Sequence, residues 1–327
     1  MNVSIRPFDE NDYPRQVEIV DLNYPDSPGS VEMARFNDSI WDHQRHFKRR
    51  LLAEDPTGHV VGWGEISHSP YSFHPDKYRL SLFVDPAAQR HGVGSTLYAR
   101  LIADLRERDA WLVRTDAKEA QLHSVAFLTT RGFQDVQRAW ESRLNVPAFD
   151  FAPFAGAEAR VTEQGITLTT FALEGPRDEH VRRAVYELDS LCTQDEPSVD
   201  PITPRPYEQF VKDEYEAPNT LPEAFFLAKD GPRYVGLSAL GRNLAQPDVL
   251  GQGFTAVHPD YRGRGIAMAM KIRGLRYARE HACREIRTHN NTRNVPMLRI
   301  NEALGFVKQP VWIEFQLTLR EVLAATP

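Results

Sequence analysis

The chain has 327 residues, a length that predicts about two domains. Hydrophobic residues make up 41% of it and charged residues 26%, which is typical of a globular protein and excludes a disordered chain or a fibre. Its net charge of −6 argues against binding to nucleic acid, which normally requires a basic surface. No apolar run is long enough for a membrane helix, so we expect no membrane partner. Two cysteines and the lack of a secretion signal predict reduced thiols in a cytoplasmic protein.

The first half of the sequence predicts strands followed by helices. Strands are expected from alternating apolar residues between turns, at residues 4–8, 49–55, 60–67, 78–84 and 111–115. Leu97, Leu101, Ile102 and Leu105 have the spacing of a helix that lies on a sheet, which we place at residues 95–108. A second helix is predicted at residues 122–130, ended by a glycine.

The second half repeats this order. Strands are expected at residues 166–172, 224–228, 234–240, 252–257, 285–288 and 311–319, and helices at about 265–281 and 295–304. Since short turns join most strands, each half is predicted to be an α/β domain with a mixed, largely antiparallel sheet and one strand–loop–helix crossover. Residues 147–163 have two prolines and no helical pattern, so we expect them to link a domain at 1–146 to a domain at 164–327.

The two halves are also related residue by residue. Residues 84–133, shifted by 173 positions, align with residues 257–306, and ten of the 50 pairs are identical without a gap. Average composition would give about three identities by chance. A period this long is too large for a solenoid repeat, so it indicates a duplicated domain.

Each half carries a strand, a glycine loop and a helix in succession. The loops read Val84-Asp-Pro-Ala-Ala-Gln-Arg-His-Gly-Val-Gly94 and Val257-His-Pro-Asp-Tyr-Arg-Gly-Arg-Gly-Ile-Ala267. The first N–H groups of a helix are unpaired and attract anions, and glycine lets a phosphate approach them. Neither loop matches a dinucleotide fingerprint or a P-loop. The same strand–loop–helix pattern occurs twice, 173 residues apart, which favours a pyrophosphate-binding site over a simple turn.

These loops resemble motif A of the Gcn-related N-acetyltransferase (GNAT) superfamily, and the two later Gly-Phe pairs, at 132–133 and 305–306, resemble its motif B. The resemblance covers nearly the whole chain and implies two tandem GNAT domains that use acetyl-CoA as co-substrate. In the family the loop binds the pyrophosphate, and the strand before it pairs with the pantetheine arm. The residues implied are Leu82, Phe83, Val84, Gln89, Arg90, His91, Gly92, Val93 and Gly94 in the first half, and Thr255, Ala256, Val257, Arg262, Gly263, Arg264, Gly265, Ile266 and Ala267 in the second.

The second half is the one that we expect to be active. Asn294 opens its last helix, as asparagine does in similar family members, and the resemblance therefore implies a role in cofactor binding. Asn294 is equally well explained as an N-cap. The first half has Gln121 at this place, and it could bind the cofactor or be a structural remnant.

The usual acid and base of the family have no counterpart. Many members place a tyrosine four residues before the glycine of motif B, where this chain has Leu128 and Asn301. The glutamate that is frequent on the fourth strand corresponds to Tyr78 and Gly251. The usual acid is therefore absent, supplied elsewhere or replaced by water.

Three other carboxylates are candidates for the proton acceptor, namely Glu65, Asp195 and Glu196. The resemblance implies direct transfer of the acetyl group to a primary amine of a small molecule or peptide, by a monomer or a homodimer. The alternative is a non-catalytic protein that binds or senses acyl-CoA. No His-x-x-x-His or Cys-x-x-Cys spacing occurs, so no metal is expected.

Overall fold

The computed structural model describes residues 1–320, and contacts between residues divide the chain into two compact units. Unit 1 consists of residues 1–138 together with residues 312–320. Unit 2 consists of residues 139–311. Each unit contains one strand–loop–helix crossover, as the repeat predicts.

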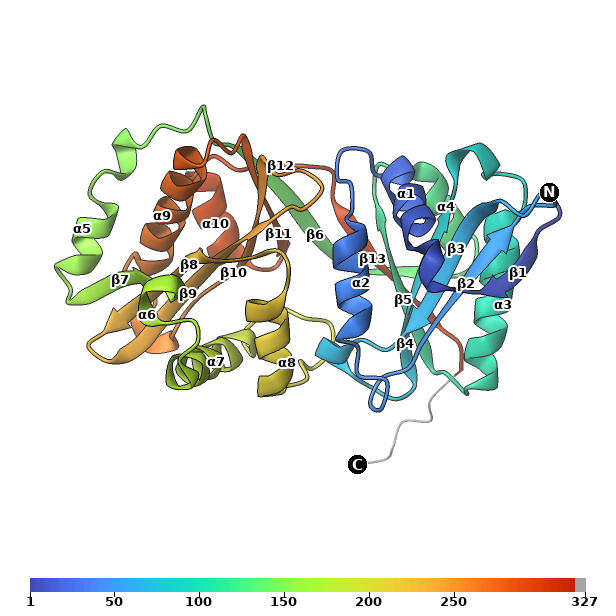
Figure 1. The fold of residues 1–327 in the computed structure, drawn as a ribbon, viewed down its shortest axis with the longest axis horizontal. Coiled ribbons are helices and arrows are strands. Elements are labelled where there is room, and N and C mark those ends of the chain that lie inside the picture. The colour runs from blue at the N-terminus through green and yellow to red at the C-terminus, as the bar shows by residue number, and fades with distance from the viewer. Residues whose placement is uncertain (321–327) are drawn as a thin grey trace. The chain divides into compact units, whose positions relative to one another are not determined.

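Unit 1 is a mixed sheet covered by helices (Figure 1). Its strands, in spatial order, are β1 (Ser4–Pro7), β2 (Lys48–Glu54), β3 (Val60–Ser67), β4 (Lys77–Val84), β5 (Leu112–Lys118) and β13 (Trp312–Thr318). Its helices are α1 (Tyr13–Asn23), α2 (Val31–Ser39), α3 (Val93–Glu107) and α4 (Leu122–Thr129). Only β4 and β5 are parallel, and the other neighbours are antiparallel.

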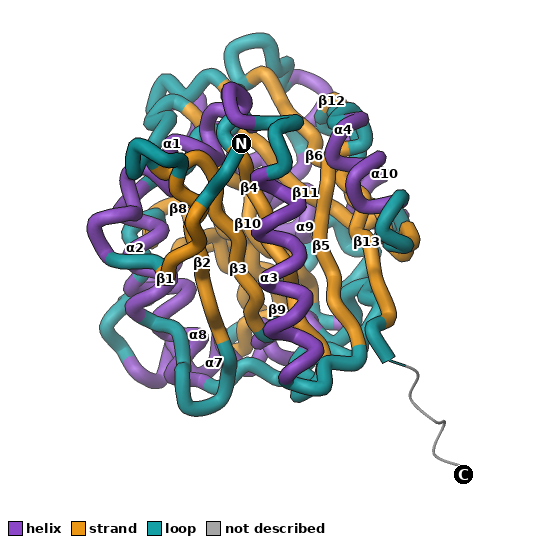
Figure 2. The backbone as a smooth tube through the Cα atoms, turned by 90° about the vertical axis from the view of Figure 1, so that its right-hand side faces the viewer, coloured by secondary structure: helices purple, strands orange, loops and turns teal. Residues whose placement is uncertain are grey.

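Successive residues of β3 show which helix covers which face. Side chains alternate along a strand, so neighbouring residues point to opposite faces. A Cβ added to Gly62 or Gly64 would meet side chains of α3, whereas Trp63 packs against Ile19 of α1. The two glycines therefore let α3 approach the sheet closely, and α1 covers the other face. Figure 2 shows α3 running along the strands that it covers.

Unit 2 has the same plan. Its strands, in spatial order, are β6 (Gln134–Asn145), β11 (Glu285–Asn291), β10 (Val249–Val257), β9 (Arg233–Arg242), β8 (Thr220–Asp230) and β7 (Ile166–Thr170), and β12 (Val307–Lys308) also pairs with β6. Its helices are α5 (Ala157–Thr162), α6 (Phe171–Glu174), α7 (Glu179–Thr193), α8 (Tyr207–Val211), α9 (Ile266–Glu280) and α10 (Val295–Ala303), and a π-helical turn (Lys212–Glu216) follows α8. β10 and β11 are the parallel pair.

The layers of unit 2 are set by the same alternation. A Cβ at Gly236 of β9 would meet Ile266 and Met270 of α9. The next residue, Leu237, packs in a cluster with Val185 and Leu188 of α7. α9 and α7 thus cover opposite faces of this sheet, as α3 and α1 do in unit 1.

The last strand of each half belongs to the unit formed by the other half. β13 pairs with β5 along its whole length, from Trp312 opposite Lys118 to Thr318 opposite Leu112. β6 pairs with β11, from Ala139 opposite Asn291 to Asn145 opposite Glu285. The units therefore differ from the predicted boundaries at residues 139–146 and 312–320. The residues of neither strand indicate which edge it completes, because strand pairing depends on contacts between segments that lie far apart in the sequence.

The segment predicted as a linker contains a packed helix. Within residues 147–163, α5 buries Ala157 and Val161 in the core of unit 2, where the cluster also includes Ile266. Three phenylalanines before α5 pack against the same core. The prediction of a linker without a helix is therefore wrong for residues 157–162, because two small apolar residues suffice to seat one short turn.

Across residues 1–320, no helix combines the length and the apolar character needed to cross a membrane.

Candidate functional site

In each unit the parallel pair of strands separates after a few residues, and we call this opening the fork. In unit 2, β10 pairs with β11 only from Val249 to Gln252. In unit 1, β4 pairs with β5 only from Lys77 to Arg79. The strand residues that the resemblance implies, 82–84 and 255–257, lie beyond these last pairs. Their backbone groups on the side of the fork are therefore placed where an extended amide chain could pair with them.

The loop after each fork strand has the same backbone shape in both units. Arg90 and Gly92 in unit 1, and Gly263 and Gly265 in unit 2, have positive φ angles between 66° and 89°. The first helical hydrogen bonds run from Thr96 N–H to the Gly92 carbonyl and from the equivalent residue of unit 2 to Gly265. The N–H groups before them have no acceptor within their helix, and turns of this type form a concave site for an anion.

One side chain ties each loop to its strand. Gln89 donates to the Val84 carbonyl at 3.1 Å, and Arg262 donates to the Val257 carbonyl at 3.0 Å. Arg262 also forms an ion pair of 2.6 Å with Asp195. The Asp195 carboxylate thus holds the arginine that stabilises the loop, and the role of Asp195 as proton acceptor stays a prediction.

The fork strand of unit 2 carries a β-bulge that the fork strand of unit 1 lacks. β10 has one extra residue between Gln252 and Thr255 relative to its partner β9, whereas β4 pairs with β3 without interruption. Because of the extra residue, positions before the bulge are displaced by one relative to unit 1. Gly251 therefore lies opposite Arg287, as Arg79 lies opposite Arg114. The offset of 173 aligns Gly251 with Tyr78, and the structure corrects this to Arg79. Bulges frequently redirect backbone groups beside active sites.

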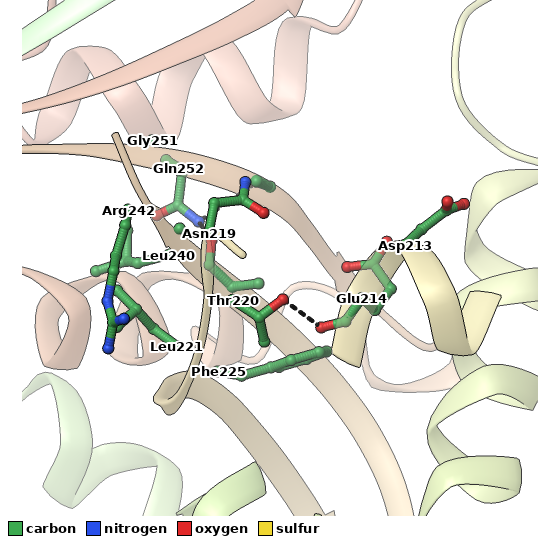
Figure 3. Close-up of a pocket in the computed structure, with 13 residues that line it drawn as sticks. Asp213, Glu214, Asn219, Thr220, Leu221, Phe225, Leu240, Arg242, Gly251 and Gln252 are labelled. Atoms are coloured by element: carbon green, nitrogen blue, oxygen red, sulfur yellow. Dashed lines mark hydrogen bonds between the residues drawn. The ribbon is translucent and has the colours of Figure 1, made fainter. Parts of the chain in front are cut away.

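A pocket of about 250 Å³ lies beside this bulge (Figure 3). It is lined by Asp213, Glu214, Asn219, Thr220, Leu221, Phe225, Ala239, Leu240, Gly241, Arg242, Gly251, Gln252 and Gly253. Glycines at 241, 251 and 253 keep its floor open. The pocket thus combines an apolar wall, amide groups and carboxylates, which suits a polar ligand with a cationic group.

Three carboxylates share one arginine, and two of them, Asp213 and Glu214, line the pocket. Arg205 contacts Asp189 at 3.0 Å, Asp213 at 3.1 Å and Glu214 at 2.9 Å. Burial raises the pKa of Glu214 and that of Asp189 despite the guanidinium. A carboxylate with a raised pKa accepts a proton more readily than an ordinary one.

Two further groups lie at the fork of unit 2. Glu196 is exposed, yet the surrounding protein raises the pKa of its carboxyl, and Asp189 adds to this. His289 is the first residue of β11 beyond the last pair with β10, and its Nε2 is 3.8 Å from the buried carboxylate of Glu141. The sequence predicts Glu196 as a candidate but not His289, because one histidine at a strand end is not a signal.

The third predicted carboxylate, Glu65, belongs to unit 1. It lies on β3 and forms an ion pair of 2.6 Å with the half-buried Arg50. The structure therefore separates Glu65 from the pair of candidates in unit 2, and its catalytic role stays a prediction.

Motif B has the predicted helix start. The Asn294 side chain accepts a hydrogen bond from the Met297 N–H at 3.3 Å, so its role as N-cap is confirmed and its role in cofactor binding stays a prediction. Asn301 is buried and donates to Asn290 at 2.7 Å. The side-chain oxygen of Asn301, Oδ1, has no hydrogen-bond partner among the described residues. Leu128 and Asn301 lack an acidic hydroxyl, so neither can donate a proton as a phenol does.

Within the described part of the chain, no three His, Cys, Asp or Glu side chains are grouped as metal ligands. The expectation of a metal-free protein stays a prediction.

Comparison with known proteins agrees with this geometry. The profile of the acetyltransferase (GNAT) family matches residues 17–133 and 183–306, one match in each half. A mycothiol acetyltransferase of Thermobifida fusca is 25% identical over 245 residues, which cover 71% of each chain. A mycothiol acetyltransferase of Catenulispora acidiphila is 26% identical over 282 residues, which cover 83% of this chain and 81% of the relative.

Solved structures share the fold at low identity. A tandem GNAT protein from the clavulanic acid biosynthesis pathway superposes with a TM-score of 0.76 at 17% identity, covering 98% of this chain and all of that one. A GCN5-related N-acetyltransferase from Sphaerobacter thermophilus superposes with a TM-score of 0.70 at 16% identity, covering 98% and 97%. These likenesses show the tandem fold.

Proposed function

The chain belongs to the acetyltransferase (GNAT) family, and we propose that it moves the acetyl group of acetyl-CoA directly to a primary amine, with unit 2 as the active unit. The observation that carries this proposal is the succession of fork, bulge and loop in unit 2, next to a pocket with carboxylates. The loop at 262–267 would bind the diphosphate through its N–H groups, and the free edge of β10 would pair with the pantetheine arm.

The bulge and the pocket give the reaction its two other requirements. An N–H group of the bulged strand would polarise the thioester carbonyl, as an oxyanion hole does. The pocket would hold the amine on the other side of that carbonyl. Attack by the amine nitrogen on the carbonyl carbon forms the amide, the bond from carbon to sulfur breaks, and CoA leaves as a thiolate.

A group at the fork must take the proton of the amine, because only a neutral amine attacks. We propose Glu196 for this step, supported by its raised pKa and its place at the fork. His289, 3.8 Å from Glu141, is the second candidate. Since Asn301 cannot act as an acid, the leaving thiolate would be protonated by solvent.

Two features support unit 2 over unit 1. Only β10 has the bulge, and only in unit 2 does an asparagine cap the helix of motif B. In unit 1 the side chain of Gln121 forms no cap and instead contacts Asn23 and Tyr24.

The curated relatives favour a small-molecule acceptor. Both are named mycothiol acetyltransferases, so the amine form of mycothiol that lacks the acetyl group is the first acceptor to test. Two buried free thiols, Cys192 and Cys283, are compatible with the cytoplasm as the location.

The test is thiol release from acetyl-CoA in the presence of this amine, other small amines and peptides. We expect turnover with at least one amine, and loss of most turnover in Glu196→Gln. Glu65→Gln is the matched control and should retain activity, because Glu65 lies in unit 1. Tight binding of CoA without turnover on any amine would instead support the alternative, a non-catalytic acyl-CoA sensor, which the lack of an acidic hydroxyl at Leu128 and Asn301 favours.

A further inference from the structure

A short segment at the end of α1 in unit 1, and one after α7 in unit 2, contact residues on both sides of the fork. They read Asn23-Tyr24-Pro25 in unit 1 and Asp195-Glu196-Pro197 in unit 2. The segments are equivalent because each first residue accepts a hydrogen bond from the side chain that ties the loop to its strand. Gln89 donates to Asn23 at 3.0 Å, and Arg262 donates to Asp195 at 2.6 Å. Tyr24 and Glu196 therefore occupy corresponding places.

In unit 1 the ring of Tyr24 fills the fork. On the side of β4 it packs edge-on against Phe83, with ring centroids 6.0 Å apart. On the side of β5 it lies 5.3 Å from the ring of Trp312, and the ammonium group of Lys118 lies over it at 5.3 Å. Its hydroxyl donates to Gln121 at the start of α4 at 3.0 Å. One side chain thus contacts both arms of the fork and the helix that follows it.

The residues around this place are large in unit 1 and small in unit 2. Phe83 precedes Val84 as Ala256 precedes Val257, the aligned pair of the repeat. Trp312 lies opposite Lys118, and Ala139 lies opposite Asn291, which is 173 residues after Lys118.

Three aromatic rings in unit 1 therefore correspond to two alanines and one glutamate in unit 2. Glu196 is exposed, whereas the ring of Tyr24 is packed on several sides. The fork of unit 2 is left open by small residues, and that of unit 1 is filled by the chain itself.

We infer that Tyr24 is the specificity-determining residue that closes the fork of unit 1 to the acyl-thioester arm, so that acetyl-CoA binds to unit 2 alone. This inference rests on the proposed function, because it takes the fork as the place of the arm. The loop of unit 1 keeps its backbone shape, but the arm of the ligand has no path past the Tyr24 ring.

Calorimetry with coenzyme A tests this on the full chain. The wild type should bind one equivalent, and Tyr24→Ala should bind two, because removal of the ring opens the second fork. Tyr24→Phe is the matched control, since it keeps the ring and loses only the hydroxyl, and it should bind one equivalent. In Tyr24→Ala, a further Gly265→Val change should weaken one of the two sites by at least about tenfold and leave the affinity of the other, in unit 1, unchanged.

The outcomes separate the two levels of the proposal. Two equivalents in the wild type, or one in Tyr24→Ala, would overturn the role of Tyr24 and leave the proposed function standing. No binding by either protein would overturn both. Should Tyr24→Ala fail to fold, Tyr24→Ser also removes the ring, and two equivalents are again the expected result and one equivalent the contrary one.

Discussion

Units 1 and 2 have a similar backbone fold and differ in the side chains at the fork. Both have a fork, a loop with two left-handed residues and a helix laid on glycines of the sheet. The differences are the bulge of β10 and the size of the side chains at the fork. A duplicated fold can therefore retain the shape of an anion-binding loop while local side chains decide whether the rest of a ligand enters.

The two units also differ in the pKa of carboxyl groups on the side of the sheet that bears the pocket. In unit 1, Asp38 on α2 accepts hydrogen bonds from Tyr13, Lys48 and Arg50, and Arg50 also pairs with Glu65. Burial by itself would raise the pKa of Asp38, but these donors hold it below its ordinary value. Glu214, which lines the pocket of unit 2, has a raised pKa because burial outweighs Arg205. The donors around Asp38 thus hold it ionised in unit 1, whereas Glu214 in unit 2 accepts a proton more readily than an ordinary carboxylate.

The exchanged strands give the largest expected effect. Phe315 on β13 is buried in unit 1, and Leu144 on β6 is buried in unit 2. We expect Phe315→Ala to lower the free energy of unfolding of unit 1 by about 3–5 kcal/mol, and Leu144→Ala that of unit 2 by about 2–5 kcal/mol. Hydrogen exchange checks this, with faster exchange on β5 in the first variant and on β11 in the second. The opposite assignment would contradict the exchange of strands.

Filling the pocket of unit 2 is expected to have the second-largest effect. Gly251 lies on its floor, and a Cβ there would meet nothing nearer than the Gly241 carbonyl oxygen at 4.0 Å. Gly251→Leu should therefore fold and fill the pocket, lowering kcat/KM for the amine by about 100-fold. The affinity for coenzyme A serves as the internal control and should not change. Unchanged kcat/KM would show that the acceptor binds elsewhere.

The two loops offer a matched pair of changes. Gly265 and Gly92 both begin their helices with positive φ, where a branched side chain costs about 1–2 kcal/mol. Gly265→Val should distort the loop of unit 2 and weaken binding of coenzyme A by at least about tenfold, since 1.4 kcal/mol corresponds to that factor. Gly92→Val should leave the affinity as it is, because the fork of unit 1 is filled. Equal losses in both variants would mean that the units share the ligand.

Much of the fold follows from the sequence because its signals are local. The helix over residues 95–108 and its counterpart in the second half follow from apolar spacing, and the structure has them as α3 and α9. The family follows from two glycine loops at one offset, and the family match confirms it. Both signals depend only on neighbouring residues.

The other features depend on contacts that the sequence does not encode locally. β6 pairs with β11 and β13 pairs with β5, so each strand completes a sheet edge formed by residues far away in the sequence. The bulge lies between Gln252 and Thr255, before the gapless repeat begins at Val257, so the repeat does not reveal its extra residue. The closing role of Tyr24 requires Phe83 and Trp312, which lie 59 and 288 residues further along the chain. None of these juxtapositions leaves a periodic pattern.

The smallest expected effect concerns one buried position that differs between the units. Lys271 on α9 is 3% exposed, and its ammonium group lies 5.7 Å from the ring of Phe306. Its counterpart, Tyr98 on α3, packs edge-on against Phe127 in the same kind of site. Burial lowers the pKa of Lys271 to about 7, because the charged form loses its water.

This difference predicts that stability depends on pH through Lys271, and not through Tyr98, between about pH 7 and 10.4. Below pH 7 the lysine is charged in both states, so the folded protein bears the full cost of burying it. Between about pH 7 and 10.4 it is charged only when unfolded, so stability rises with pH across this window. Lys271→Met should remove this slope and raise the free energy of unfolding at pH 7 by about 1–2 kcal/mol, measured by urea denaturation. Tyr98→Phe is the matched change in unit 1 and should leave the slope over this window intact. A Lys271→Met protein that retained the slope would show that another group, and not this lysine, governs it.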